Sequence, residues 1–506
     1  MSPLKLAVIG GGPSAFYVAS RILKLQPEAR NLRIHLYDRL WAPHGLVRYG
    51  VAPDHPEVKN CVHKFDQVAE DNRFRFFGNV DVGDSANSIW HTLRLPLASI
   101  FKNYSHVLFA TGCTLPTLHG DLPPSPYCVP ALSLVHWYTQ HPNTPAPPPL
   151  DKVTHVSLIG NGNVSLDVAR ILLTSVDVLA KYDVPQHVLD VLSRSTVKHV
   201  SIIGRRGPLE AAFTMKELRE MINLPEASMV PLEPSLVTPP ASGPPLTRQQ
   251  TRVLQLLKQG SKNAPGTTSK TWSLDFFRSP IGIVSPTDTS PYAQLSLAHT
   301  IVDPETQRAV PTGETSTLST DLVVTSLGFH GEPTVSFYDP GLRHLRTVAG
   351  RVVTSNGTIL KNVYASGWAA TGAKGVLATT MMNAYSVADT VISDWQAASD
   401  RVPMADDDVQ RCQADYQVHD LPPLNPNPPL DEIPEEVEKA LKQGNITDYE
   451  LWKEIDQEEI RRGEALGKER ERMGWQEMRG LSQATDQKKA RTVSGLTSGV
   501  AKFGFR

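Results

Sequence analysis

Two glycine-rich loops, each placed between an apolar strand and a helix, constrain the fold of this chain more than any other feature. The first loop contains Gly10 and Gly12 and follows an apolar run that begins at Leu6. The second loop contains Gly160 and Gly162 and follows a similar apolar run. In such a strand–loop–helix unit, the backbone N–H groups of the loop can approach a pyrophosphate at the helix N-terminus. The repeat therefore predicts two Rossmann-like units and two bound dinucleotides.

The residues that end the following strands indicate which dinucleotide each loop binds. Neither loop has the third glycine of the usual pattern, because Ala15 and Ser165 stand there, so the loops alone would also fit ordinary tight turns. After the first loop the next strand ends at Asp38, whose carboxylate suits the ribose hydroxyls of FAD or NAD and repels a 2′-phosphate. After the second loop the corresponding strand leads to Arg205 and Arg206. Two guanidinium groups favour NADP, although paired arginines are also common on solvated surfaces.

Size, charge and cysteine content limit the class of protein. The chain has 506 residues, 40% of them hydrophobic, and a net charge of −2, which predicts a soluble globular protein of at least two domains. This composition does not indicate a nucleic-acid partner or a transmembrane segment. The four cysteines include no CxxC pair, so a disulfide framework, a zinc site, a resident iron–sulfur cluster and a redox-active dithiol are not expected. The first strand begins close to Met1, so a presequence is either removed or missing.

The order of the motifs predicts an α/β fold of glutathione-reductase-like flavoprotein architecture, with two Rossmann-like nucleotide-binding domains. A strand near 321–328 closes the second unit, and the chain then returns to the first. A proline-rich stretch at 141–149 is expected to be a stiff linker, and residues 231–270 are expected to form an insertion. The expected parts are an FAD domain at 1–113, an inserted NADP domain at 114–332, the rest of the FAD domain at 333–480, and a disordered tail at 481–506.

Several longer blocks resemble one known family. From Leu6 to about Arg479, the chain is similar to the NADPH:adrenodoxin reductases, the mitochondrial-type ferredoxin–NADP reductases. The blocks that carry this resemblance are Gly45–Asn60, Asn163–Leu173, Gly204–Leu209, Lys216–Met221, Ser366–Trp368 and Gly375–Met381. The departures are modest: Asp38 stands where the family commonly has glutamate, and Asn161 where it often has glutamine.

The resemblance implies which residues meet each cofactor. The FAD contacts would be Gly10, Gly12, Ser14, Asp38, Leu46, Val82, Trp368, Gly375, Val376 and Leu377. The NADP contacts would be Asn161, Gly162, Asn163, Val164, Arg205, Arg206, Glu217 and Gly375. Independently of the resemblance, a helix that begins near Gly375 could direct its N-terminal dipole at the flavin and stabilise the reduced ring. Trp368 could shield the flavin, or could simply be a core residue.

The resemblance also implies the reaction, the partner and the compartment. Hydride would pass from NADPH to flavin N5, and two single electrons would then pass to an adrenodoxin-like [2Fe-2S] ferredoxin. His55 and Asp167 would move the accompanying proton, although a histidine before a proline is more often a turn residue. Arg219, Arg248 and Arg252 would dock the acidic ferredoxin. The protein would lie in the mitochondrial matrix, with peripheral association to the inner membrane.

Two other classes of function also fit parts of the sequence. One is a glutamate-synthase-like or disulfide-reducing flavoprotein, against which the missing CxxC pair counts. The other is a nucleotide-binding protein that senses NADPH without turnover. Both loops and the segment from Trp368 to Thr380 are intact, which favours a catalytic protein.

Overall fold

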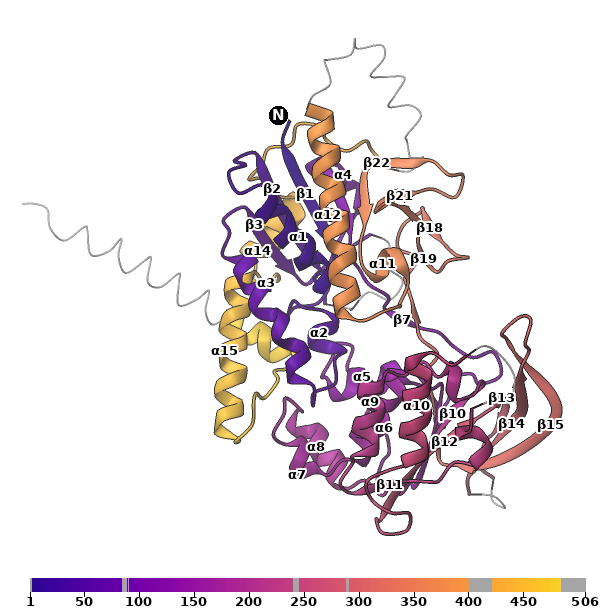
Figure 1. Cartoon of the computed structure of the whole chain (residues 1–506). Coiled ribbons are helices and arrows are strands. Elements are labelled where there is room, and N and C mark those ends of the chain that lie inside the picture. Colours follow the sequence, from indigo (N-terminus) through magenta and orange to yellow (C-terminus); the bar gives the residue numbers. More distant parts are fainter. Residues whose placement is uncertain are drawn as a thin grey trace, which may run out of the picture.

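The structure is a computed structural model that describes residues 2–83, 89, 91–239, 245–287, 291–399 and 421–483. It is an α/β protein built around two large sheets, one in each of two stacked units (Figure 1). The first sheet is mixed, because β20, β21 and β22 pair antiparallel, and the second is parallel throughout. The tail expected to be disordered falls almost entirely outside the described residues, as does Cys412.

The first sheet has seven strands in the order β20-β21-β22-β6-β1-β2-β3. Every residue of β1 is buried, as is typical of a parallel strand covered on both faces. The helices α1, α3 and α12 pack on one face, and α4 and α14 on the other. The strands are β1 (Leu4–Ile9), β2 (Leu32–Asp38), β3 (Phe74–Gly78), β6 (His106–Phe109), β20 (Thr347–Val348), β21 (Arg351–Val353) and β22 (Ile359–Ala365). The helices are α1 (Pro13–Leu25), α3 (Val62–Ala69), α4 (Leu97–Asn103), α12 (Leu377–Ser399) and α14 (Glu435–Lys442).

The second sheet has six strands in the order β11-β12-β10-β9-β16-β8, and all their pairings are parallel. Helices cover one of its faces, and a three-stranded antiparallel sheet, β13-β14-β15, covers the other. The strands are β8 (Cys128–Pro130), β9 (His155–Ile159), β10 (His199–Gly204), β11 (Ala227–Met229), β12 (Lys270–Phe276), β13 (Arg278–Val284), β14 (Ala293–Val302), β15 (Ala309–Thr320) and β16 (Leu322–Thr325). The helices are α5 (Ala131–Tyr138), α6 (Asn163–Leu173), α9 (Met215–Ile222) and α10 (Arg248–Gln259).

The second unit is inserted into the sequence of the first. The chain leaves the first sheet after β6 and returns to it at β20, and its two crossings pair as β7 (Leu115–Pro116) and β17 (Phe329–His330). The proline-rich stretch at 141–149 precedes β9 as expected, but it does not separate the two units. It lies inside the second unit, because β8 and α5 come before it in the chain. The expected insertion at 231–270 contains α10, whose apolar side packs on the second core.

A C-terminal segment after α15 (Tyr449–Ala465) ties the two units together. The buried Arg472 donates hydrogen bonds to the carbonyl oxygens of Arg48 (2.7 Å) and Thr139 (2.6 Å), which belong to different units. It also pairs with Asp183 at 2.5 Å, and Lys59 reaches the same carboxylate at 2.8 Å. Burial alone would raise the pKa of Asp183, but the two cations hold it well below its usual range.

Candidate dinucleotide sites

In the first glycine-rich loop, the backbone requires glycine at position 10 and leaves open space beside position 12. Gly10 has φ +104°, and a Cβ atom there would lie 2.5 Å from the carbonyl oxygen of Ala110. Gly12 has an ordinary φ of −81°, and a Cβ there would meet no atom within 4 Å. No described side chain caps α1, which begins at the next residue. The loop therefore presents open backbone at a helix N-terminus, as an anionic pyrophosphate requires.

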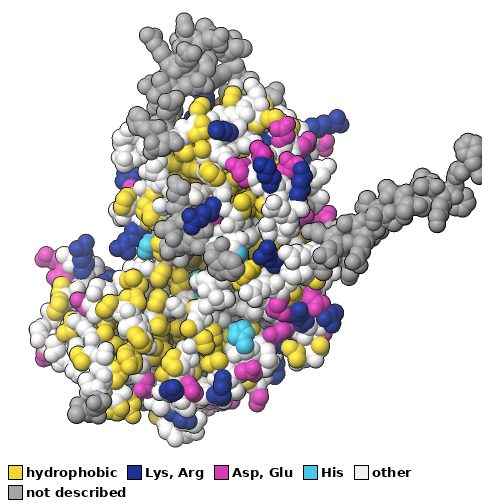
Figure 2. Space-filling model, turned by 180° about the vertical axis from the view of Figure 1, so that it is seen from behind, with side chains coloured by type: hydrophobic (Ala, Val, Ile, Leu, Met, Phe, Trp, Pro, Cys, Tyr) yellow, Lys and Arg dark blue, Asp and Glu magenta, His cyan; other side chains and the backbone are white. Residues whose placement is uncertain are grey.

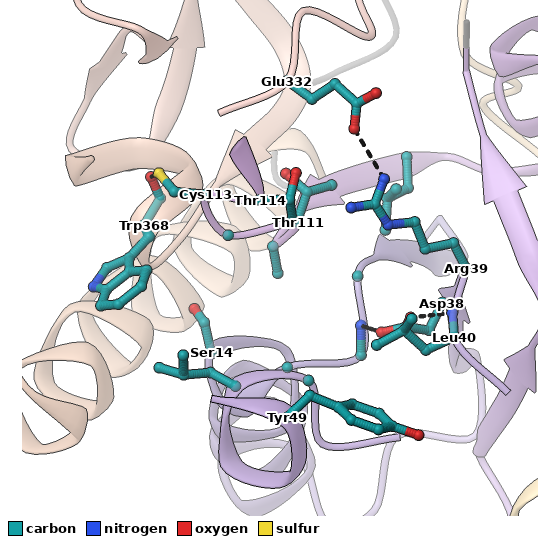
Figure 3. A pocket seen from close by; sticks show the side chains of 18 of the residues that line it. Ser14, Asp38, Arg39, Leu40, Tyr49, Thr111, Cys113, Thr114, Glu332 and Trp368 are labelled. Carbon is teal, nitrogen blue, oxygen red and sulfur yellow. Dashed lines mark hydrogen bonds and ion pairs between the residues drawn. The ribbon is translucent and has the colours of Figure 1, made fainter. Parts of the chain in front are cut away.

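A cleft opens in front of this loop, with about 1360 Å³ of empty space including the part open to solvent. Its lining runs from the first loop and the end of β2 to Trp368, an extended shape that suits a dinucleotide. Figure 3 shows Asp38 and Arg39 at one end of the cleft and Trp368 at the other. Of the residues expected to meet FAD, the cleft is lined by Gly10, Gly12, Ser14, Asp38, Leu46, Val82 and Trp368.

Gly375, Val376 and Leu377 do not line this cleft, although α12 starts where the sequence predicts a helix. Gly375 has φ +83°, and the N–H of Val376 donates to Thr379 Oγ1 at 3.0 Å. Thr380, further along the same helix, does line the cleft. The start of α12 is thus beside the cleft rather than in its wall.

Asp38 binds the loop as well as lining the cleft. Its side chain is buried, with Oδ1 accepting from the N–H of Leu40 (2.7 Å) and Oδ2 from the N–H of Gly11. A Cβ at Gly11 would lie 2.6 Å from that carboxylate oxygen, so this glycine is needed for the contact. Burial raises the pKa of Asp38 to about 6, even though both hydrogen bonds oppose the shift. One carboxylate thereby fixes the end of β2 against the pyrophosphate loop.

Two contacts across the cleft were not predicted. Arg39 pairs with Glu332 at 2.9 Å, which joins the end of β2 to the segment after β17 (Figure 3). Ser14 Oγ lies 2.7 Å from Ser366 Oγ and joins α1 to the end of β22. The position of Arg39 next to Asp38 is a signal that could have been used. Nothing in the sequence around Glu332 indicates its role.

The Trp368 end of the cleft holds a neutral thiol, that of Cys113. The Trp368 indole N–H donates to the carbonyl oxygen of Lys374 at 3.1 Å, and its ring stacks with Phe329 at a centroid distance of 6.5 Å. Cys113 donates from Sγ to the Trp368 carbonyl oxygen at 3.3 Å. Burial raises the pKa of this thiol to about 12, so the group is not a thiolate nucleophile at neutral pH.

The second loop repeats the geometry of the first. Gly160 has φ +116°, and a Cβ there would lie 2.3 Å from the carbonyl oxygen of Ser326. A Cβ at Gly162 would meet no atom within 4 Å. The Asn161 side chain packs against Gly204, where a Cβ would lie 2.7 Å from its Nδ2 atom. These contacts fix the loop against β10, on which the two arginines follow.

Two arginines beside this second loop have no carboxylate partner among the described residues. Arg205 is exposed and Arg206 half-buried, and within the described part of the chain neither forms an ion pair. Asn163 begins α6 and accepts from the N–H of Thr214 at 2.7 Å, which places the start of α9. Glu217 lies in the first turn of α9 and is half-buried. Free guanidinium groups next to an open loop suit a dinucleotide with an additional phosphate.

His55 and Asp167 lie in one charged cluster at the junction of the two units. His55 Nε2 lies 2.8 Å from Glu220 Oε2, a partner that the sequence did not indicate. Arg170 contacts three carboxylates: Asp54 (2.5 Å), Asp167 (2.8 Å) and Glu220 (3.2 Å). Burial raises the pKa of Asp167, although Arg170 and His55 oppose this. No direct hydrogen bond joins His55 to Asp167 in the described structure, so Arg170 and Glu220 connect them.

The fold and the two loop sites define a class: a flavoprotein oxidoreductase that uses FAD and NADPH. The chain is 34% identical over 488 residues to the mitochondrial NADPH:adrenodoxin oxidoreductase of Salvelinus fontinalis. The alignment covers 93% of this chain and 89% of that protein. The Homo sapiens protein of that name is 34% identical over 490 residues, with 93% and 90% covered. This chain belongs to the NADPH:adrenodoxin oxidoreductase family.

A solved structure agrees with this assignment. Mycobacterium tuberculosis FprA in complex with NADPH superposes with a TM-score of 0.76 at 31% identity, over 95% of this chain and 99% of that chain. The bacterial NADPH-ferredoxin reductase FprA is 35% identical over 406 residues, with 78% and 84% covered. No protein-family model matches the chain. Among the helices of the described ranges, none is both long and apolar enough to cross a membrane.

Proposed function

We propose that this protein passes electrons from NADPH, through FAD, to an adrenodoxin-like [2Fe-2S] ferredoxin. The observation that carries this proposal is the pair of open loops, one followed by Asp38 and the other by Arg205 and Arg206. Relatives named NADPH:adrenodoxin oxidoreductase and NADPH-ferredoxin reductase support the choice of partner. The mitochondrial proteins among these relatives support a mitochondrial location, with peripheral inner-membrane association as the finer proposal. The proposed limits between the FAD domain and the inserted NADP domain are 113/114 and 332/333.

The residues of the first cleft would hold FAD. Gly12 and the start of α1 would bind the pyrophosphate, Asp38 the adenosine ribose, and Trp368 would lie at the flavin end. When bound, FAD supplies a carrier that takes two electrons as hydride at N5 and gives them up singly. Asn161 to Val164, Arg205, Arg206 and Glu217 would hold NADPH.

The visible spectrum tests the function directly. The purified protein should be yellow, and anaerobic NADPH should bleach it within seconds, while NADH does so far more slowly. A ferredoxin should then restore the oxidised spectrum. A yellow protein that NADPH does not bleach would favour the non-catalytic sensor, and a colourless protein that cannot take up FAD would contradict the proposal.

Replacing His55 separates proton movement from cofactor binding. We propose that His55, with Glu220 and Asp167, holds or moves the proton that accompanies reduction. His55→Gln replaces the imidazole, which lies 2.8 Å from Glu220, by a polar side chain of similar size that cannot take up a proton. We expect FAD content and the Kd for NADPH to stay within about twofold of the parent, with the rate of reduction lowered about tenfold or more. A variant that purifies colourless would show that His55 supports the flavin site instead.

The ferredoxin-docking surface is proposed to be the arginine-bearing side of α9 and α10. Arg219, Arg248 and Arg252 are exposed, and the sequence of α10 has no acidic residue. This helix lies at the front of the second unit in Figure 1. On the opposite face, shown in Figure 2, positive and negative side chains are intermixed. The acid-free sequence of α10 therefore suits an acidic partner, although Glu217 and Glu220 lie beside Arg219 on α9.

Charge reversal tests this docking surface. Arg248→Glu combined with Arg252→Glu should lower ferredoxin-dependent cytochrome c reduction about tenfold or more at low salt, because like charges would then meet across the interface. Direct reduction of ferricyanide, which needs no docking, should change little. In the parent, ferredoxin-dependent activity should fall as salt shortens the Debye length from about 10 Å at 0.1 M to about 3 Å at 1 M. A double variant that reduces ferredoxin as well as the parent would place docking elsewhere.

A further inference from the structure

Two histidines of the second unit line the cleft of the first. His136 lies in α5, and His141 begins the proline-rich stretch that follows it. Both line the same cleft as the first glycine-rich loop, and both are half-buried. Their imidazole rings stack with a centroid distance of 3.9 Å and an angle of 10° between the ring planes. The cleft of the first unit is therefore closed on one side by the second unit.

The pair is held in place by polar and aromatic neighbours. The side-chain amide of Asn143 bridges the two rings, at 2.9 Å from Nδ1 of His136 and 2.9 Å from Nδ1 of His141. Tyr49 meets the His141 ring edge to face, at a centroid distance of 5.1 Å. For the Nε2 atoms, the described residues provide no hydrogen-bond partner. Fixed rings with free outer atoms can contact a ligand without first being ordered.

The rings are neutral, and they lie toward the Asp38 end of the cleft. Burial lowers the pKa of His136 to about 4 and that of His141 well below its ordinary value, and the positive charge of Arg39 adds to both shifts. Arg39 itself follows Asp38 and pairs with Glu332. The charged and titratable groups facing the pair are therefore Arg39 and Tyr49. Neutral aromatic rings suit the base of a nucleotide, which stacks on such surfaces.

We propose that the stacked His136–His141 pair contacts the adenosine half of FAD, so that the second unit helps to retain the flavin. This inference rests on the proposed function, because it takes FAD as the ligand of the cleft. The proline-rich stretch then has a defined role. Proline limits the backbone freedom of 141–149, which keeps His141 against His136 at the wall of the cleft.

Apoprotein binding measures the contribution of the pair. His136→Ala and His141→Ala should each raise the Kd for FAD about tenfold or more, measured by quenching of flavin fluorescence. The double replacement by phenylalanine keeps two neutral rings and should stay within about threefold of the parent. His199→Ala is the matched control, because burial lowers the pKa of His199 to about 4 and it faces His155 at 4.9 Å, but it does not line the cleft. Its Kd for FAD should be unchanged.

A second measurement uses the parent protein, so it does not depend on how the variants fold. Carbethoxylation of histidines, mapped by peptide mass spectrometry, should modify His136 and His141 in the apoprotein and spare them once FAD is bound. The exposed His63 should react equally in both states. Equal modification of the pair with and without FAD would overturn the inference, as would alanine variants that bind FAD like the parent. If the parent apoprotein takes up no FAD at all, the proposed function fails as well.

Discussion

Replacing Arg205 and Arg206 together by alanine is expected to raise the KM for NADPH roughly 100-fold or more and to leave the use of NADH nearly unchanged. The two guanidinium groups follow β10 next to the open second loop, and in the described structure neither is engaged in an ion pair. They are thus free to make charge-assisted hydrogen bonds to a 2′-phosphate, which NADH lacks. Steady-state kinetics with both nucleotides measures the effect.

The control is Arg308→Ala, which removes an exposed arginine from the loop between β14 and β15 of the same unit. It lowers the net charge without touching the second loop, so both KM values should remain close to those of the parent. If the double variant loses NADPH and NADH activity equally, the two arginines support the fold, and they do not select the nucleotide.

The second large effect is expected from two matched glycine replacements, Gly12→Ala and Gly162→Ala. At either position a Cβ would meet no protein atom within 4 Å, so the alanine variants should fold and melt as the parent does. Each new methyl group would instead occupy the space that a pyrophosphate needs for close approach. Gly12→Ala should weaken FAD binding about 100-fold and give a colourless protein. Gly162→Ala should stay yellow and lose bleaching by NADPH.

Gly10→Ala serves as the contrasting variant for this pair. Its Cβ would lie 2.5 Å from the carbonyl oxygen of Ala110, and φ is +104°, so the protein itself should be destabilised. A lower melting temperature of the apoprotein is expected here and not for Gly12→Ala. If Gly12→Ala binds FAD normally, the pyrophosphate does not approach the first loop. If Gly162→Ala purifies colourless, the two loops do not bind separate nucleotides.

The architecture and both cofactors could be predicted because their signals are local. A glycine-rich loop between a strand and a helix can be recognised from neighbouring residues alone. The residue that contacts the ribose, at the end of the next strand, follows within the same βαβ unit. The α/β class, the inserted second unit and the family are confirmed by the sheets and the relatives. The assignments of individual site residues stay predictions, including His55 and Asp167.

Other parts of the site could not be predicted because they join distant segments. Glu332 meets Arg39, and Glu220 meets His55, across 293 and 165 residues of the sequence, so each pair forms only when the chain has folded. The same holds for His136. The sequence places it on an ordinary helix, and only the folded structure shows that it lines the cleft. The prolines of 141–149 predict a stiff backbone and so suggest a linker. They do not indicate which residues this backbone holds in place.

The place of β22 in the first sheet has a consequence for biosynthesis. This strand pairs with β6, and β6 pairs with β1, so the sheet stays incomplete until residue 365 has left the ribosome. By then the whole second unit has been translated and can fold, while the edge of β6 that later pairs with β22 is still unpaired. Flavin capture is therefore a late event of synthesis. Trp368 and Thr380, which line the flavin cleft, are translated later still.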